Sequence, residues 1–426
     1  MKFGAIGNFM AGQVADFLVS LKGRCLLFFR RRCLAGFPWY WPARPPGQYA
    51  MVEARRTVRR HFGRDHHPAL RTIAKILVTI AWPPAVLVNL LQARYMMGPD
   101  AMPINRAAGA LWVAIRHNIL PTEYYAYGLW RGDRRRDIDS YLFANESSRL
   151  FKVLNRPLER DPIGDKLAFH EMCKAHDLPT PAVLAAFAPT GKLMDFAFGR
   201  PPQQDLFVKA SSGNSFAERF RWHGADFESD CGCRLSREEL GAYLANRARI
   251  KNQTLVVQPV LSNHPDLRVE SSGALATVRL VTGRSVNDEV IPIFSFILFG
   301  LPNRIEAHSN CVTLIDVATG RLMPAPPRKS PAMSMYQYRE FGLNDACTLP
   351  DWHLALCHIK VAHKVCSNFV FVGWDVAFTE RGPMILEGNV NWDAATFQTL
   401  RDEPLGYTKF ADILATRLTS ERGTGK

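Results

Sequence analysis

The pattern of hydrophobic and polar positions predicts short strands and helices from about residue 165 onward. Apolar runs rich in β-branched residues predict strands at 206–209, 254–257, 276–281, 370–378 and 383–387. Helical spacing predicts two helices, 165–177 and 236–250. The second helix opens with a capping-box pattern, Ser236 followed by Glu239. The last two strands flank a tight turn, Glu380-Arg381-Gly382, and so predict a hairpin.

The N-terminal third has a different pattern, in which apolar runs stand beside arginine clusters. One such stretch covers 17–32 and another covers 55–91, with Trp39, Tyr40 and Trp41 between them. The apolar run 76–91 is shorter than the roughly 20 residues of a membrane span, and Pro83-Pro84 interrupts it. It therefore predicts a buried or surface-lying pair of helices. The polar run 131–137 marks a boundary.

Charge strengthens this division of the chain. Of the 426 residues, 1–150 hold 22 Lys and Arg against 9 Asp and Glu, whereas the rest hold 31 against 30. Such a basic segment favours an anionic membrane surface as the partner of residues 1–100, and the lack of a recognised binding module disfavours nucleic acid. The alternative is a helical domain with solvated arginines. No export signal is evident and the nine cysteines lack framework spacing, so a cytoplasmic protein is expected, with the inner membrane face as its peripheral site.

The hairpin carries the clearest candidate chemistry. If its turn is centred on Arg381, Asp375 pairs directly with Glu387, and Asn389 points to the same face. Two carboxylates and an amide oxygen on one face are ligands suited to a hard cation such as Mg²⁺. The alternative is an ordinary hairpin with its polar residues in water. A register shifted by one residue would put the two acids on opposite faces.

Basic residues that suit phosphate binding occur earlier in the chain. Lys209 ends an apolar strand and precedes the small polar loop 211–215, in which Gly213 allows close backbone approach to an anion. Arg279 lies on an apolar strand, where its charge requires an anionic partner. Lys166 opens the predicted helix 165–177. A surface lysine and a surface hairpin are the alternatives for Lys166 and for the loop.

Taken in order, these segments resemble the ATP-grasp superfamily, and within it the sugar-transfer associated ATP-grasp family. The resemblance covers roughly residues 125–400 and rests on 165–166, 207–209, 257–267, 277–279 and 373–393. It implies an α+β fold in which two subdomains clamp ATP, preceded by a basic, mainly helical region. The expected boundaries are 1–130 for that region, 131–204 for the start of the core, 205–262 for a lid and 263–426 for the catalytic subdomain.

The resemblance also implies a role for each candidate position. Arg279 and Lys209 are the expected catalytic residues, with Arg279 contacting a phosphate or acylphosphate. The expected metal ligands are Asp375, Glu387 and Asn389, which would hold two Mg²⁺ ions or Mn²⁺ in their place. The expected nucleotide contacts are Lys166, Lys209, Ser211, Ser212, Gly213, Asn214, Ser215, Gln258, Pro259, Val260 and Asp266. The sequence departs from the family pattern at two places. Position 258 is Gln258, where many relatives have an acid, and the segment 303–315 lacks the paired glycines expected near the acceptor site.

The implied reaction is activation of a carboxylate by Mg-ATP as an acylphosphate, followed by attack of an amine, with a sugar or polysaccharide precursor as the expected acceptor. Two alternatives stay open: a kinase-like phosphotransferase on the same fold, and a membrane-associated nucleotide-binding protein without catalysis. The identities of donor and acceptor, the oligomeric state and the role of the close pair Cys231 and Cys233 do not follow from the sequence.

Overall fold

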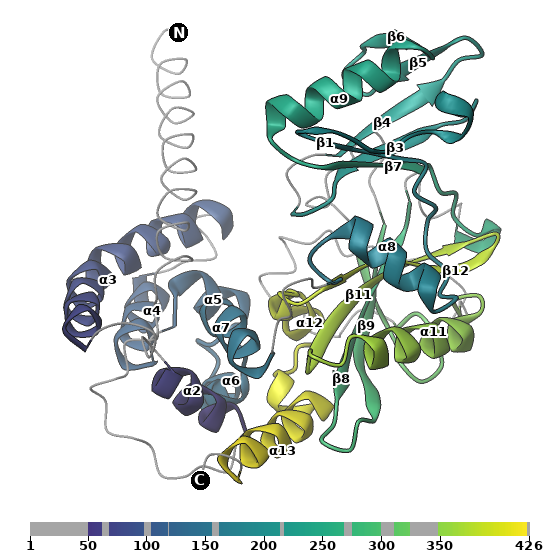
Figure 1. Cartoon of the computed structure of the whole chain (residues 1–426). Helices are drawn as coiled ribbons and strands as arrows, with labels where there is room; N and C mark the ends of the chain where they lie inside the picture. The colour runs from purple at the N-terminus through teal and green to yellow at the C-terminus, as the bar shows by residue number, and fades with distance from the viewer. Residues whose placement is uncertain are drawn as a thin grey trace, which may run out of the picture. The chain divides into compact units, whose positions relative to one another are not determined.

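A computed structural model describes residues 50–61, 68–97, 104–117, 119–155, 162–213, 217–267, 275–299, 311–323 and 348–423 (Figure 1). The chain forms two compact units, 1–153 and 154–426. Within the described ranges, no helix is both long and apolar enough to cross a membrane.

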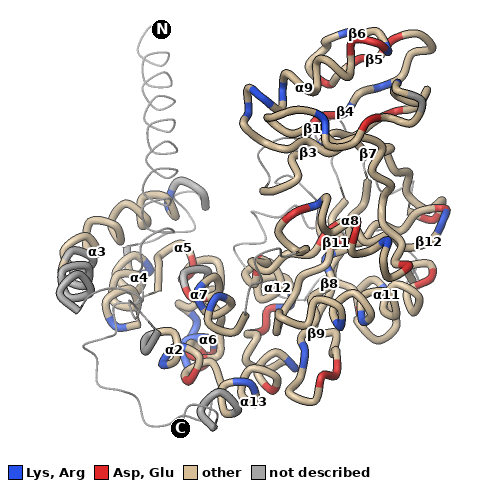
Figure 2. The backbone as a smooth tube through the Cα atoms, in the orientation of Figure 1, with Lys and Arg blue, Asp and Glu red and all other residues tan. Residues whose placement is uncertain are grey.

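The first unit is helical. Its elements are α2 (Ala50–His61), α3 (Pro68–Met97), α4 (Ile104–His117), α5 (Pro121–Ala126), α6 (Gly132–Arg136), η2 (Ile138–Ser140) and α7 (Ala144–Leu154). Trp82 and Val86 of α3 are buried against Ala114 of α4. Arg55 of α2 donates to the carbonyl oxygens of Asp139 and Tyr141, at 2.8 and 2.6 Å, which ties α2 to the end of the unit. Helices α3 and α4 carry no acidic residue (Figure 2).

The predicted break at Pro83-Pro84 is wrong, because α3 is one helix of 30 residues that runs through both prolines. Proline fixes φ near the helical value, so its main cost inside a helix is the lost N–H donor and the crowding of the preceding turn. Both prolines are exposed. Water can therefore reach the backbone around them, which lowers the cost of the missing hydrogen bonds.

The second unit contains an antiparallel seven-stranded sheet in the order β2-β1-β7-β3-β4-β5-β6. Its strands are β1 (Ala185–Ala188), β2 (Gly191–Met194), β3 (Leu206–Ala210), β4 (Ala217–Trp222), β5 (Asp226–Ser229), β6 (Arg234–Ser236) and β7 (Leu255–Pro259). Helix α9 (Glu239–Lys251) lies across this sheet and buries Leu240 and Leu244 in a shared core (Figure 1). The predicted capping box is present, since Ser236 N donates to Glu239 Oε2 at 2.8 Å and Glu239 N donates to Ser236 Oγ at 3.3 Å.

A five-stranded antiparallel sheet in the order β10-β9-β8-β11-β12 forms the rest of this unit. Its strands are β8 (Thr277–Arg284), β9 (Val290–Phe299), β10 (Cys311–Ile315), β11 (Phe371–Thr379) and β12 (Gly382–Asn389). The accompanying helices are α8 (Lys166–Ala175), α11 (Trp352–Val365), α12 (Ala394–Arg401) and α13 (Lys409–Gly423), with short turns η3 (Ala197–Gly199) and η6 (Leu405–Tyr407). Every strand and helix predicted from residue 165 onward is present, with its ends within three residues of the prediction.

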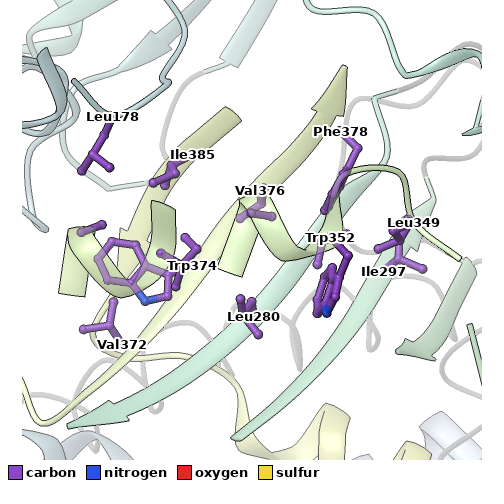
Figure 3. Packing of buried hydrophobic residues seen from close by; sticks show 14 of the residues in the cluster. Leu178, Leu280, Ile297, Leu349, Trp352, Val372, Trp374, Val376, Phe378 and Ile385 are labelled. Carbon is purple, nitrogen blue, oxygen red and sulfur yellow. The ribbon is translucent and has the colours of Figure 1, made fainter. Parts of the chain in front are cut away.

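One face of the five-stranded sheet carries the main hydrophobic core (Figure 3). Leu280, Trp374 and Val376 project from β8 and β11 into a cluster that also takes in residues of α8 and α11. The Trp374 indole donates to Thr282 Oγ1 at 2.8 Å, and this hydroxyl lies 2.7 Å from His363 Nδ1. Burial lowers the pKa of His363 to about 4, so the imidazole is neutral in this apolar layer.

Candidate active site

Strands β8, β11 and β12 place ionic side chains in one row across the sheet. Asp375 of β11 pairs directly with Arg279 of β8 on one side and with Glu387 of β12 on the other. Directly paired residues point to the same face of a sheet, and neighbours along a strand point to opposite faces. A guanidinium and two carboxylates therefore lie on the face opposite the Trp374 core.

The pairing of Asp375 with Glu387 depends on a β-bulge. Next to the turn, Thr379 pairs with Gly382 and Val376 pairs with Ile385. Continued unchanged, this register would pair Asp375 with Leu386. The register shifts between Asp375 and Val376, so Leu386 becomes the extra residue and the two acids face each other. The register predicted from a turn centred on Arg381 is thus confirmed at the acids and wrong nearer the turn.

The two carboxylates are held by Arg279 and Asn389. Arg279 donates two hydrogen bonds to Asp375, from Nε to Oδ1 at 2.5 Å and from Nη2 to Oδ2 at 3.0 Å. The Asn389 amide donates to Asp375 Oδ2 at 3.2 Å and to Glu387 Oε1 at 3.3 Å. A single amide nitrogen therefore bridges the acids, which places their oxygens close together.

Two lysines complete the charged group. Lys166, the first residue of α8, lies with Nζ 3.2 Å from Glu387 Oε2 and also donates to the carbonyl oxygen of Gly213 at 3.2 Å. The pKa of Lys209 is lowered to about 8, chiefly by burial and also by nearby Lys166, whereas Glu387 and Asp375 oppose the shift. Strand β3 thus brings a buried ammonium toward the acids of the other sheet.

The acids and Arg279 perturb one another strongly. Burial raises the pKa of Asp375 to about 6 although Arg279 opposes the rise, and Glu387 adds to it by repulsion. Burial also acts to raise the pKa of Glu387, but Lys166 and Lys209 outweigh it and lower that pKa. Burial alone would lower the pKa of Arg279, and Asp375 reverses this and raises it. Asp393 also acts to raise the pKa of Arg279, and the three cations of the group are side chains that can attract phosphate.

The loop after β3 is fastened to the N-terminus of α8. Asp165 caps α8 by accepting from Leu167 N at 2.8 Å and Ala168 N at 3.0 Å. The same Asp165 oxygen accepts from Ser211 Oγ at 2.7 Å, and Lys166 N donates to the carbonyl oxygen of Ser211 at 2.8 Å. Ser212 and Gly213 are exposed, and Gly213 has φ +70°, a conformation that favours glycine. The other two loop positions, Asn214 and Ser215, lie outside the described residues.

The other four expected nucleotide contacts are the hinge residues Gln258, Pro259 and Val260 and the ribose-binding Asp266. The contacts described below for these residues are not with the charged group. Gln258 is buried in β7, where its amide nitrogen lies 3.4 Å from the carbonyl oxygen of Pro181. Pro259 has no N–H, and the Val260 N–H already donates to the carbonyl oxygen of Asp205 at 3.1 Å. Asp266 is exposed, and Asp266 Oδ2 lies 3.4 Å from His264 Nδ1. Their roles toward a nucleotide stay predictions.

A pocket of about 120 Å³ opens beside the row of ionic side chains. Its walls include Gly164, Lys166, Phe169, Gly213, Glu387 and Asn389. Residues of α8, of the loop after β3 and of the end of β12 that carries Glu387 thus line one pocket. The pocket does not reach Gln258, Val260 or Asp266.

Comparison with known families decides the classification. The profile described as "Sugar-transfer associated ATP-grasp" matches residues 145–408, more than half of the chain. This protein belongs to the sugar-transfer associated ATP-grasp family. Its mixed α+β architecture, with two antiparallel sheets after a helical region, is the expected ATP-grasp fold. No curated protein matches the sequence.

Solved structures with some similarity include two ligases and a synthetase. D-alanine–D-alanine ligase from Bacillus anthracis is 11% identical over 60% of this chain and 64% of its own, with a TM-score of 0.31. The Helicobacter pylori ligase of the same name is 14% identical over 61% of each chain, with a TM-score of 0.33. N5-carboxyaminoimidazole synthetase from Staphylococcus aureus, complexed with ADP, is 10% identical over 60% of this chain and 50% of its own, with a TM-score of 0.31.

An ATP-grasp protein is expected to use magnesium, and the acids on β11 and β12 suit that ion. The donor set of Asp375, Glu387 and Asn389 consists of two carboxylates and an amide, and its oxygens are the ligand type that Mg²⁺ prefers. In the structure, Arg279 donates to a carboxylate oxygen of Asp375, and Lys166 lies against one of Glu387. The Asn389 nitrogen donates to both acids. Rotation of the Asn389 amide would present its oxygen instead, because the two ends of the group are nearly equal in shape.

Sequence reasoning missed two residues that support this ATP-grasp site. It placed Asp165 at a helix start but not its bond to Ser211, which joins residues 46 positions apart. It also gave no role to Gly373. A Cβ at Gly373 would lie 2.8 Å from the Cβ of Trp392 and 3.3 Å from the Cδ of Arg279, so glycine is required for their close approach. A glycine inside a strand is the signal that could have indicated such an approach.

Proposed function

We propose that this ATP-grasp protein is a Mg-ATP-dependent ligase that activates a carboxylate as an acylphosphate and joins it to an amine. The observation that carries the proposal is the cross-strand row Arg279–Asp375–Glu387 with Lys166 at its end. Such a row offers ligands for a hard cation and cations for phosphate oxygens within one site. The family assignment supports the same reaction class.

In the first step, a carboxylate oxygen of the donor attacks the γ-phosphorus of ATP, the bond to the β-phosphate oxygen breaks, and ADP leaves. In this proposal, Lys166 and Lys209 hold phosphate oxygens. Arg279, which is already aligned by Asp375, offsets the negative charge on the transferred group. Bound Mg²⁺, held by Asp375, Glu387 and Asn389, would supply Lewis-acid stabilisation of the phosphate oxygens.

In the second step, the amine nitrogen attacks the acyl carbon, the carbon–oxygen bond to phosphate breaks, and the amine releases a proton. The leaving phosphate carries one oxygen of the original carboxylate. Water must be kept away from the acylphosphate, since hydrolysis would waste it. The seven-stranded sheet bears Lys209 and the loop 211–215, so we propose that it acts as the lid of the site.

The acceptor we propose is an amine on a sugar or polysaccharide precursor, and the place we propose is the cytoplasm, which supplies ATP. Support for this acceptor comes only from the description of the family. The segment 303–310, which is expected to border the acceptor site, lies outside the described residues.

The test measures whether an oxygen atom of the donor carboxylate is transferred to the released phosphate. The purified chain is incubated with Mg-ATP, ¹⁸O-labelled carboxylates and hydroxylamine as a small amine that intercepts acylphosphates. ADP, phosphate and hydroxamate in equal amounts, with one ¹⁸O per phosphate, are the expected result. The matched variant Glu387→Gln should give none of them.

Other products would contradict the proposal in distinguishable ways. Phosphate attached to a hydroxyl of a sugar added in place of the carboxylate would indicate a kinase on this fold. Nucleotide binding without consumption of ATP across amino acids, hydroxy acids and sugar acids would favour a binding protein.

A further inference from the structure

The first unit has a surface that the proposed ligase reaction does not use. Ile76, Ile80, Leu87 and Leu91 of α3 are 52, 68, 54 and 58% exposed. They are spaced by four, seven and four residues, so they form one stripe along the helix. Trp82, Val86 and Ala93 of the same helix are buried on another face. Helix α3 therefore has two apolar faces: one packs inside the unit, and the other, the exposed stripe, lies on its surface.

The exposed stripe is long and nearly all apolar. The two prolines in its middle, Pro83 and Pro84, are also exposed, and Arg94 is exposed just beyond its end. The 15 residue steps from Ile76 to Leu91 correspond to about 22 Å along the helix, so the stripe extends well beyond an isolated surface leucine. On helix α4, Trp112 and Ile115 are likewise exposed, at 51 and 59%. Exposed apolar surface of this extent indicates an interaction site.

Charge decides what kind of partner fits. By sequence, helices α3 and α4 contain Arg71, Lys75, Arg94, Arg106 and Arg116 and no acidic residue, and the Arg94 side chain is exposed beside the stripe. A second copy of the chain would bring this positive charge against itself. Residues 1–49 would do the same, because they hold seven Lys and Arg against one acid. An apolar, acid-free surface of positive charge is complementary to an anionic lipid bilayer.

We propose that the exposed stripe of α3 docks the protein on an anionic membrane surface, with Ile76, Ile80, Leu87 and Leu91 among the acyl chains. The opposite face of α3, which carries Trp82 and Val86, stays packed against Ala114 of α4, so the helix lies along the surface. The inference is independent of the ligase proposal, since none of these residues belongs to the ATP-grasp sheets.

Vesicle flotation of the full-length chain tests this surface. The vesicles are phosphatidylcholine alone, or phosphatidylcholine with about 30% phosphatidylglycerol. The test variant is Ile80→Glu with Leu87→Glu, two exposed positions where glutamate costs no core packing. The matched control is Ile250→Glu on α9, whose side chain is 65% exposed in the other unit. Circular dichroism and melting confirm that each variant is folded.

Binding to the anionic vesicles only, reduced at least about tenfold by the double substitution and unchanged by Ile250→Glu, is the expected result. Added salt should weaken it. Equal binding by the double variant would overturn the proposal and assign the contact to another segment, such as 1–49. Absence of binding by the unsubstituted chain would also overturn it. A lipid-free dimer that the double substitution converts to monomer would identify the stripe as a self-association surface instead.

Discussion

The two faces of the five-stranded sheet are built from the same strands and have opposite characters. On one face Leu280, Trp374 and Val376 are buried in an apolar core. On the other, one residue away along each strand, Arg279 and Asp375 form a partly buried ion pair. Because side chains alternate along a strand, a single hairpin can hold the fold together and carry the chemistry. Substitutions on the two faces should therefore separate stability from activity.

The largest expected effect is that of Arg279→Met. Loss of the guanidinium should reduce carboxylate-dependent ATP turnover by about 100- to 1000-fold, since it removes the charge that we propose acts on the transferred phosphoryl group. It should also reduce the free energy of unfolding by roughly 3–5 kcal/mol, because buried Asp375 loses its partner. Steady-state kinetics and urea denaturation measure both. Arg279→Lys is the control that keeps the charge, and equal turnover in Arg279→Met would exclude Arg279 from the reaction.

Trp374→Ala tests the opposite face. Removing this fully buried indole should lower the free energy of unfolding by about 3–5 kcal/mol. The Mg-ATP affinity of the remaining folded protein should stay within about threefold, because the hydrogen bond of the Trp374 indole goes to Thr282 and not to the charged row. Denaturation and calorimetry on the same sample provide the comparison. A large loss of affinity at full folding would show that the two faces are not separable.

The pKa of Lys209 predicts a pH effect confined to the charged face. Burial lowers this pKa to about 8, so the ammonium that attracts phosphate is present below that pH and is lost as pH rises through it. Mg-ATP affinity should fall above pH 8, by at most about tenfold per pH unit for a single proton. Lys209→Arg stays charged and should remove the fall. The same fall in Lys209→Arg would assign the titration to another group.

The smallest expected effect lies away from both faces. Ser236→Ala removes one half of the capping box of α9 and should cost about 1 kcal/mol. Nucleotide affinity should not change, because Ser236 has no described contact with the charged row. Thermal melting measures the first effect and calorimetry the second. A larger loss than that of Trp374→Ala would contradict the ranking.

The sequence predicted the elements better than their connections. Apolar runs rich in β-branched residues located β11 and β12, and helical spacing located α8, because those signals are local. The common face of Asp375 and Glu387 was predicted from a symmetric turn, whereas the chain uses a two-residue turn and a bulge at Leu386 to reach the same pairing. No local signal could pair Arg279 with Asp375, which are 96 positions apart. The continuous helix through Pro83-Pro84 went against local propensity and depends on exposure of the prolines.

The most direct test of the charged row is calorimetric binding of Mg-ATP to the full chain and to the near-isosteric variants Asp375→Asn and Glu387→Gln. Magnesium-dependent binding is predicted for the unsubstituted chain, with affinity reduced at least about 100-fold in each variant, because each loses an anionic ligand. Circular dichroism must show both variants folded. Unchanged affinity in both folded variants, or binding that does not depend on magnesium, would contradict the assignment of this face of the sheet as the Mg-ATP site.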